Sequence, residues 1–253
     1  MTAAVPEIVI RHCRGLDEFN ACVELQKEVW GFSDRDLIPV RMFVVADKVG
    51  RQIIGGFAGA ELVAFSLSVP GMHAARPYLH SHMLAVRDPY RNSGLGRRIK
   101  LFQREDALSR GIGLIEWTFD PLEIKNAWFN LERLGAIVRR YTINQYGITS
   151  SPLQGFLPTD RCIAEWWLDS ERVRAIAAGQ PRPQIPVERT IEVPAEIYEW
   201  KANEATRQRA HDVLLLNREL FLKAFEQGLA VIGYERNARG DGKFLLGRWS
   251  ETA

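Results

Sequence analysis

The sequence predicts a mixed α/β (α+β) protein, in which a mixed central sheet is flanked by helices and followed by a small helix-plus-hairpin extension. Three observations lead to this prediction. Short apolar segments bounded by turn residues alternate with amphipathic segments along most of the chain. Residues 80–113 predict a strand, a glycine-containing loop and a helix in direct succession. Residues 203–227 carry apolar side chains three or four positions apart, which is typical of an amphipathic helix.

Composition excludes several classes of protein. The chain has 253 residues, with 46% hydrophobic and 25% charged residues, as soluble globular proteins do. Its formal net charge of +2 comes from 33 basic and 31 acidic residues, so we expect no nucleic-acid partner. Cys13, Cys22 and Cys162 show no metal or disulfide spacing, which favours a reducing compartment and no metal site. No apolar run approaches a membrane span and no signal segment is evident, so we expect a cytoplasmic protein without a membrane partner.

The first third of the chain predicts two helices and three strands. In order, the expected elements are a strand at 7–13, helices at 16–30 and 40–49, a hairpin of strands at 51–57 and 61–69, and a loop at 70–77. Trp30, Phe32 and Phe43 lie in or beside the two helices and could face a substrate, although each is more typical of a core residue.

Residues 80–113 organise the rest of the chain. Residues 81–86 form a short apolar strand that ends at Asp88-Pro89, and residues 99–109 form an amphipathic helix that ends at Gly111. Between them lies a loop with Gly94 and Gly96. Free backbone N–H groups at the start of a helix attract anions, and the helix dipole adds to the attraction. This arrangement therefore predicts an anion site.

The loop sequence narrows the choice of anion. A dinucleotide fingerprint fails because its third glycine would fall on Ile99, and a P-loop fails because no G-K-[ST] occurs here. What remains is Arg91-x-x-Gly94-x-Gly96, in which the glycines let the backbone close on a pyrophosphate. Arg97 and Arg98 add positive charge. Taken alone, the six-residue pattern also fits an ordinary strand-to-helix turn.

With the preceding Leu84-Ala85-Val86 and Pro89, this loop resembles the coenzyme A signature R/Q-x-x-G-x-G/A of the GCN5-related N-acetyltransferase (GNAT) superfamily. The resemblance covers about residues 7–169 and implies the GNAT fold, with acetyl-CoA as co-substrate and no metal. In the superfamily the strand before the loop pairs with pantetheine and its N–H groups hold the oxyanion. The resemblance implies that the cofactor is bound by Leu84, Ala85, Val86, Arg91, Asn92, Ser93, Gly94, Leu95, Gly96, Arg97 and Asn126.

Asn126 enters through a second block. Residues 114–119 predict a strand, 124–134 a helix and 136–143 another strand. The sequence from Asn126 to Gly135 resembles the superfamily's second signature, N-x-x-A…Y-E-K-L-G-F, whose asparagine contacts the pantetheine arm. The tyrosine of that signature, which protonates the departing thiolate, falls on Leu131. The acid role is thus unfilled: Asn130 could only hydrogen-bond sulfur, and the remaining candidates are Tyr78, Tyr141, Tyr146 and solvent.

Two histidines are candidates for the base. An alkylamine titrates near pH 10, roughly like lysine, so acetyl transfer at neutral pH benefits from a base, and histidine titrates in the right range. His80 and His82 are two apart on the predicted strand and should share a face. The segment HSHMLAV resembles the corresponding strand of arylalkylamine N-acetyltransferases, which implies that His82 is the base and His80 its partner. The alternative is a pair of structural histidines hydrogen-bonded within the sheet.

Glu116 is the rival base. It lies on an apolar strand, where an acid is unexpected. Either it is a base whose pKa is raised by burial, or it pairs with an arginine. Asp120, at the end of the same strand, is more typical of a turn or a helix cap.

The C-terminal third predicts a tail outside the superfamily core. A long polar loop at 144–160 and a strand at 161–168 complete a domain over residues 7–169. A proline-containing connector at 170–194, the helix at 203–227 and a hairpin of strands at 229–234 and 243–249 form a second segment, residues 170–253. This tail packs on the domain, pairs with a second copy of the chain as a homodimer, or covers substrate.

These features indicate an acyl-CoA-dependent N-acyltransferase that transfers acetyl from acetyl-CoA directly to an amine of a small molecule or peptide. Two alternatives remain. The missing tyrosine and the tail are also compatible with a non-catalytic acyl-CoA-binding or sensing module. The same scaffold could use another acyl donor or an oxygen acceptor, because a fold does not determine the acceptor.

Overall fold

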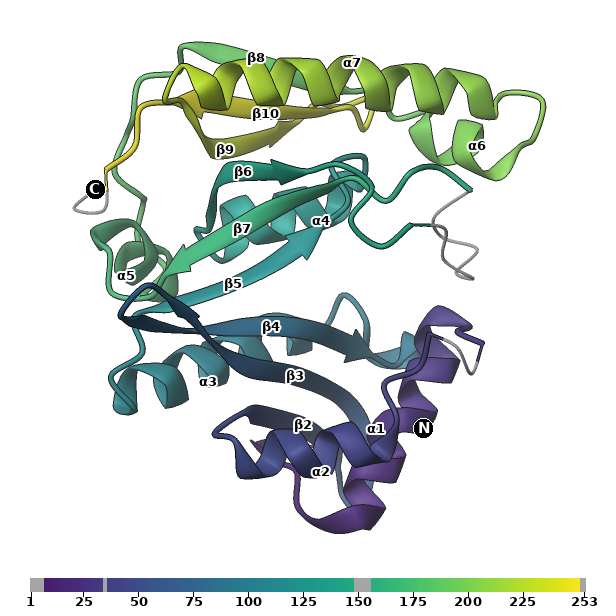
Figure 1. Ribbon diagram of the computed structural model, residues 1–253, viewed down its shortest axis with the longest axis vertical. Coiled ribbons are helices and arrows are strands. Elements are labelled where there is room, and N and C mark those ends of the chain that lie inside the picture. The colour runs from purple at the N-terminus through teal and green to yellow at the C-terminus, as the bar shows by residue number, and fades with distance from the viewer. Residues whose placement is uncertain (1–6, 34–35, 148–155, 251–253) are drawn as a thin grey trace, which may run out of the picture. The chain divides into compact units, whose positions relative to one another are not determined.

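The computed structural model describes residues 7–33, 36–147 and 156–250. The chain forms two compact units, Met1–Ile115 and Glu116–Ala253. Both units combine sheet and helices, as the mixed α/β prediction requires (Figure 1). No helix in the described ranges combines the length and apolar character that crossing a bilayer requires.

The first unit contains an antiparallel sheet in the order β1-β2-β3-β4. Its elements are β1 (Ile8–His12), α1 (Gly15–Trp30), α2 (Val40–Lys48), β2 (Gln52–Ala58), β3 (Glu61–His73), β4 (Arg76–Val86), η1 (Asp88–Tyr90) and α3 (Leu95–Ser109). Helices α1 and α2 cover one face of this sheet, where Phe19, Phe43 and Phe65 are buried together (Figure 1). Helix α3 covers the other face through Leu95 and Ile99.

The predicted loop at residues 70–77 is wrong. Strands β3 and β4 continue through it and pair as far as His73 opposite Arg76, so β4 begins well before Ser81. Ala74, with φ of 51°, makes the tight turn between them. Pro70 and Gly71 discouraged a strand in the sequence, but cross-strand pairing with Leu79 and Tyr78 outweighs their weak local preference.

The second unit has the strand order β5-β7-β6-β9-β10-β8. Its elements are β5 (Leu114–Phe119, which begins at the end of the first unit), α4 (Ile124–Trp128), η2 (Phe129–Arg133), β6 (Ile137–Thr142), β7 (Arg161–Trp167), α5 (Glu171–Ala177), β8 (Arg189–Val193), α6 (Ile197–Ala202), α7 (Arg207–Glu226), β9 (Ala230–Arg236) and β10 (Gly242–Gly247). The helix predicted at 124–134 is divided: α4 passes into a π-helical turn, η2, in which the Leu134 N–H bonds to the Phe129 carbonyl.

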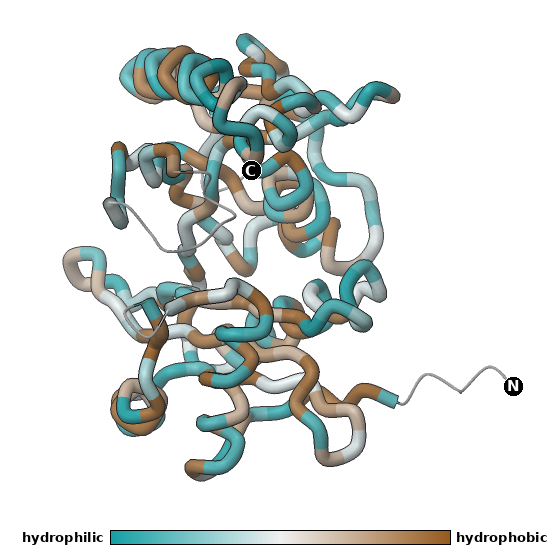
Figure 2. Tube along the Cα trace, turned by 90° about the vertical axis from the view of Figure 1, so that its right-hand side faces the viewer, coloured by the Kyte–Doolittle hydropathy of each residue, from teal (hydrophilic) through white to brown (hydrophobic). Residues whose placement is uncertain are grey.

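The tail is more structured than a connector followed by one helix and a hairpin. The connector predicted at 170–194 is wrong, because it contains α5 and β8. The predicted long helix is α7, which begins at Arg207 after the separate helix α6, and its turns alternate between hydrophobic and hydrophilic segments (Figure 2). The predicted hairpin is confirmed as β9 and β10, and β9 also pairs with β6 at Val138 opposite Val231. The tail therefore continues the sheet of the second unit.

Candidate active site

The loop between β4 and α3 has the backbone geometry of an anion site. Gly94 is the N-cap of α3 with φ of 84°, and Asn92 has φ of 59°, so both adopt the left-handed conformation. The first helical hydrogen bond runs from the Arg98 N–H to the Gly94 carbonyl at 3.1 Å, so the N–H groups of residues 95–97 precede it. A Cβ at Gly94 would meet no atom within 4 Å, so the space above the glycine is open. An anion can therefore approach the start of a helix of 15 residues.

Side chains of the loop hold it to neighbouring backbone. Arg91 donates from Nε to the Val86 carbonyl at 3.0 Å and pairs with Asp88 at 2.9 Å. Ser93 Oγ donates to the Tyr90 carbonyl at 2.6 Å. Leu95 is buried against the α3 face of the sheet, and its N–H donates to Ser93 Oγ at 3.4 Å. The predicted residues 91–97 thus lie in one loop and the first turn of α3, and Arg91 anchors this loop to the end of β4.

Strand β4 contains a β-bulge at His82. Met83 lies opposite Leu67 and Ser81 lies opposite Ser68, so His82 has no partner residue in β3. Beyond the bulge, Met83 and Ala85 are buried on the α1–α2 face. Leu84 and Val86 pack on the α3 face. The three predicted cofactor-binding strand residues therefore point to both faces, and what they share is the edge of the backbone.

The bulge also interrupts the alternation that should place His80 and His82 on one face. Their ring centroids are 6.2 Å apart and the ring planes are tilted by 37°. His80 is half-buried. His82 is exposed to solvent, although protein atoms surround much of its imidazole ring. This partial desolvation lowers the pKa of the His82 imidazole, so the neutral form is favoured. His82 as the base remains a prediction.

A buried polar cluster lies directly under the bulge, and the sequence analysis missed it. Lys100, 3% exposed, donates from Nζ to Ser81 Oγ at 2.9 Å and to Gln103 Oε1 at 3.0 Å. Gln103 in turn bonds to Ser68, and Ser68 to Gln52 at 3.4 Å. Burial lowers the pKa of Lys100 to about 7.

The sequence did carry a signal for this cluster. Ile99, Gln103 and Ala107 form the buried stripe of α3 at spacings of four, and Lys100 lies beside it. A glutamine and a lysine on the buried stripe of an amphipathic helix require hydrogen-bond partners. The facing serines of β3 and β4 supply them.

In the second unit, Glu116 pairs with an arginine. Its carboxylate, 4% exposed, contacts the Arg140 guanidinium, and Arg140 Nε also donates to Glu165 Oε1 at 3.2 Å. Arg139 completes the group by pairing with Glu165 at 2.6 Å. Burial alone would lower the pKa of Arg140, but the two carboxylates raise it. Glu116 thus forms the ion pair with an arginine that was one of the two roles expected from the sequence.

The second signature block places Asn126 on the exposed side of α4. Leu131, at the position of the superfamily's tyrosine, is fully buried in η2. Asn130 is 2% exposed, and its Nδ2 has no hydrogen-bond partner among the described residues. Tyr141 donates to Asp160 at 2.8 Å, and burial followed by nearby negative charge raises its pKa. Tyr141 is therefore held as a neutral hydrogen-bond donor, and its hydroxyl proton is already bonded to the Asp160 carboxylate.

Asp120 has the turn role expected from the sequence. Its Oδ1 accepts the Leu122 N–H at 2.8 Å, which closes an Asx-turn after β5. Its Oδ2 accepts from Lys201 Nζ of α6 at 3.0 Å, and Lys201 also pairs with Glu123 at 2.8 Å. The turn is therefore also an anchor for the tail within the second unit.

Comparisons with known proteins identify the fold. No protein-family model matches the chain, and no curated protein sequence matches significantly. Among solved structures, a putative GNAT-family acetyltransferase from Desulfovibrio desulfuricans matches with a TM-score of 0.52 and 13% identity, over 64% of this chain and 99% of that one. The putative acetyltransferase yncA from Salmonella typhimurium, solved with acetyl-CoA, matches with a TM-score of 0.52 and 12% identity, over 64% and 94%.

A third structure, the ribosomal-protein-S18-alanine N-acetyltransferase from Escherichia coli, has a TM-score of 0.50 and 14% identity, over 63% of this chain and 92% of that one. Each neighbour is covered almost completely by part of this chain. Likeness at such low identity concerns the fold, and it agrees with the fold that the loop and its flanking elements predict. The chain therefore has the fold of the GNAT superfamily.

Proposed function

We propose that the chain is an acyl-CoA-dependent N-acyltransferase, which transfers acetyl from acetyl-CoA directly to an amine of a small molecule or peptide. The observation that carries the proposal is the succession in the first unit of bulged strand β4, left-handed loop and helix α3. It combines an open anion site with a strand whose regular pairing is broken just before that site.

The loop suits the pyrophosphate of coenzyme A. The N–H groups of residues 95–97 lie ahead of the first helical hydrogen bond, and the arginines at 97 and 98 add charge. The N–H groups of a strand point alternately to its two sides, so those of β4 that do not pair with β3 point to its other side. In the proposal, such groups near Leu84 and Ala85 pair with the pantetheine arm and hold the oxyanion.

The chemistry requires a base. The amine nitrogen attacks the thioester carbon, a C–N bond forms, the tetrahedral oxyanion collapses, and the C–S bond breaks to release the thiolate. His82 accepts the amine's proton in this scheme, and its lowered pKa keeps the imidazole neutral and competent at physiological pH. His80 is its neighbour on β4. Glu116 is the second candidate, but it already contacts Arg140. Protonation of the thiolate is assigned to solvent.

Two similar structures support both kinds of acceptor. Arabidopsis thaliana Naa50, solved with the bisubstrate analogue CoA-Ac-MVNAL, has a TM-score of 0.50 and 12% identity. The aminoglycoside 6′-acetyltransferase type Ii has a TM-score of 0.50 and 17% identity. The ligand of Naa50 contains a peptide, and the second enzyme is named for a small-molecule acceptor. The fold therefore supports an amine acceptor without selecting its class.

A non-catalytic acyl-CoA sensor is the second candidate. The buried Leu131 at the position of the superfamily's tyrosine favours it. Release of free thiol from acetyl-CoA, measured with a panel of alkylamines, arylalkylamines and peptides, separates the two functions. A thiol release above the hydrolysis background for any acceptor excludes the sensor, and acetyl-CoA binding without such release favours it.

The cofactor assignment is tested by Gly94→Asp, with acetyl-CoA binding followed by titration calorimetry. The aspartate adds a negative charge where a phosphate should lie, so we expect affinity to fall by more than about tenfold, or about 1.4 kcal/mol. Gly59→Asp is the matched control, because Gly59 is also left-handed, with φ of 62°, and a Cβ there would likewise meet no atom within 4 Å. Equal affinity of a folded Gly94→Asp variant and the Gly59→Asp control would refute the loop assignment.

A further inference from the structure

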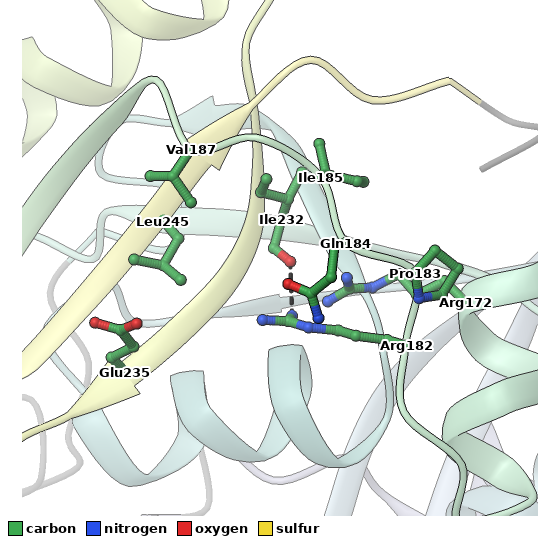
Figure 3. Close-up of a pocket in the computed structure, with 9 residues that line it drawn as sticks. All are labelled: Arg172, Arg182, Pro183, Gln184, Ile185, Val187, Ile232, Glu235 and Leu245. Atoms are coloured by element: carbon green, nitrogen blue, oxygen red, sulfur yellow. Dashed lines mark hydrogen bonds between the residues drawn. The ribbon is translucent and has the colours of Figure 1, made fainter.

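The second unit contains a cavity of about 170 Å³ built entirely from residues 172–245. Its walls are α5, the segment 182–187 that follows α5, and strands β9 and β10 (Figure 3). These elements belong to the tail, which lies outside the acyltransferase motifs. Arginine side chains from α5 and from the segment 182–187 both line the cavity.

Arg172 is a buried cation with neutral partners. Only 3% of it is exposed, and its Nε and Nη2 donate to the carbonyls of Gly135 and Leu131 at 2.9 and 3.0 Å. Among the residues that the structure describes, no carboxylate pairs with it. Burial and then the nearby Arg182 lower the pKa of Arg172 to about 9, against a smaller opposing effect of Glu132. A buried guanidinium without a counter-ion is unfavourable, so a bound anion would stabilise it.

Arg182, the second arginine of the cavity, pairs with Glu132. It donates from Nη1 to the Ile232 carbonyl at 2.8 Å and lies 2.9 Å from Glu132, which also accepts the Tyr234 N–H at 2.7 Å. Glu235 lies at the cavity too, but it is exposed and faces Lys243 across the β9–β10 ladder. Glu132 is the one carboxylate near the two guanidiniums and it pairs with Arg182, so this group of three side chains carries a net positive charge.

Glycines fix the position of these walls. A Cβ at Gly233 would lie 2.6 Å from Arg182 Nη2, so the missing side chain lets the guanidinium lie against β9 (Figure 3). A Cβ at Gly247 would collide with the Pro186 carbonyl, so the segment approaches β10 closely there. Just after it, the Glu188 N–H donates to the Leu246 carbonyl at 2.8 Å. The close approach at Gly247 and the hydrogen bond from Glu188 therefore fix the position of the segment 182–187.

The remaining lining selects the ligand. Ile185, Val187, Ile232 and Leu245 present apolar side chains, so one part of a ligand should be hydrocarbon. A planar carboxylate matches the donors of a guanidinium better than a spherical anion does. The volume is close to that of an apolar cavity of about 150 Å³ that holds benzene, so a ligand of the size of benzoate matches it. We propose that this cavity binds a small monocarboxylate, with its carboxylate on Arg172 and Arg182 and its hydrocarbon part on the apolar wall.

The test uses sodium benzoate as the probe and the full chain as the protein. Titration calorimetry should show saturable binding of benzoate, while benzyl alcohol at the same ionic strength, which has the same ring without the charge, should bind at least about tenfold more weakly. Arg182→Met should weaken benzoate binding by about tenfold or more. Arg174→Met, an exposed arginine of the same helix as Arg172, is the matched control and should bind benzoate like the parent chain.

Val187→Phe keeps the test decisive if Arg182→Met does not fold. Val187 is exposed and lines the cavity, so a phenyl ring there should fill the apolar part without disturbing the arginines. Benzoate should then bind at least about tenfold more weakly. Equal binding of benzoate and benzyl alcohol, or benzoate binding that neither variant changes, would overturn the proposal. Because the readout is binding of benzoate, the result does not depend on acetyl transfer.

Discussion

Lys100 of the first unit and Lys201 of the second are both buried, at 3% and 5% exposed, in opposite electrostatic surroundings. Lys100 donates to the neutral oxygens of Ser81 and Gln103. Lys201 donates to the carboxylates of Asp120 and Glu123. Burial lowers the pKa of Lys100 to about 7. For Lys201, burial also favours the neutral amine, but the two carboxylates outweigh it and raise the pKa.

The difference shows that burial alone does not determine the charge of a lysine. Desolvation acts in the same direction on both amines, and the identity of the hydrogen-bond partners determines the net sign. The first unit therefore holds an amine that can change its charge near neutral pH, directly under the bulge that carries His82. The second unit holds a permanent cation that joins α6 to the turn after β5.

The largest effect is expected at His82, in the bulge that lies over the buried polar cluster of Lys100. If it is the base, His82→Gln should lower kcat/KM by about 10² to 10⁴ for a true acceptor and leave acetyl-CoA affinity nearly unchanged. The lowered pKa of His82 places the acidic limb of the parent pH profile below the ordinary value for histidine, about 6.5, and the variant should lose that limb.

His80→Gln should have a smaller effect, and the double variant should fall short of the product of the single effects, because groups acting together are not additive. His73→Gln, whose ring stacks on Tyr78 at 4.2 Å near the tip of the same hairpin, is the control. Full activity and an unchanged pH profile in His82→Gln would leave Glu116 as the next candidate.

Lys201→Met tests the paired side of the comparison. It leaves Asp120 and Glu123 buried or partly buried without their cation, so we expect a loss of about 3–5 kcal/mol in the free energy of unfolding. The pKa of Lys201 is raised in the folded state, so its contribution is fully present below the unfolded pKa, about 10.4, and declines only as pH rises through the folded value. Urea unfolding at several pH values between 7 and 9 should give a constant difference from the parent. The exposed Lys125 provides the control substitution, and a loss as small as that of Lys125→Met would contradict the prediction.

Lys100→Met tests the neutral side. Between the folded pKa of about 7 and the unfolded pKa near 10.4, the unfolded chain binds more protons at this group, so the parent gains stability as pH rises. This contribution is complete above the unfolded pKa and is lost as pH falls to the folded pKa. The free energy of unfolding of the parent should therefore rise relative to Lys100→Met by up to about 1.4 kcal/mol per pH unit between pH 7.5 and 9.5. Parallel curves, as expected for the exposed Lys48→Met control, would show that Lys100 does not titrate in this range.

Glu116→Gln should give the smallest effect. Arg140 keeps Glu165 as a partner, so the loss of one charge from the group should lower the free energy of unfolding by about 1–3 kcal/mol. Turnover should change less than stability, because the carboxylate is engaged as an ion pair. A loss of turnover at an unchanged melting temperature would instead make Glu116 the base.

Much of the first unit was predictable because its signals are local. The β2–β3 hairpin follows from a turn at Gly59, and the helix after the loop follows from an apolar stripe and the left-handed Gly94. Residues 70–77 were mispredicted because pairing across the β3–β4 hairpin outweighs the weak strand preference of Pro70 and Gly71. Residues 170–194 were mispredicted because their prolines lie between and beyond α5 and β8 rather than within them.

By itself, the sequence determined the order of strand, glycine loop and helix at residues 81–109, and with it the fold and the prediction of an anion site. These features depend on residues a few positions apart, so their spacing and backbone preferences can be recognised in the sequence. Tertiary structure alone decided that β4 bulges at His82, that Lys100 bonds to Ser81 and Gln103, that Glu116 contacts Arg140, and that the tail extends the sheet at β6. The physical reason is that register, burial and the charge of a side chain depend on groups that folding brings together from distant parts of the sequence.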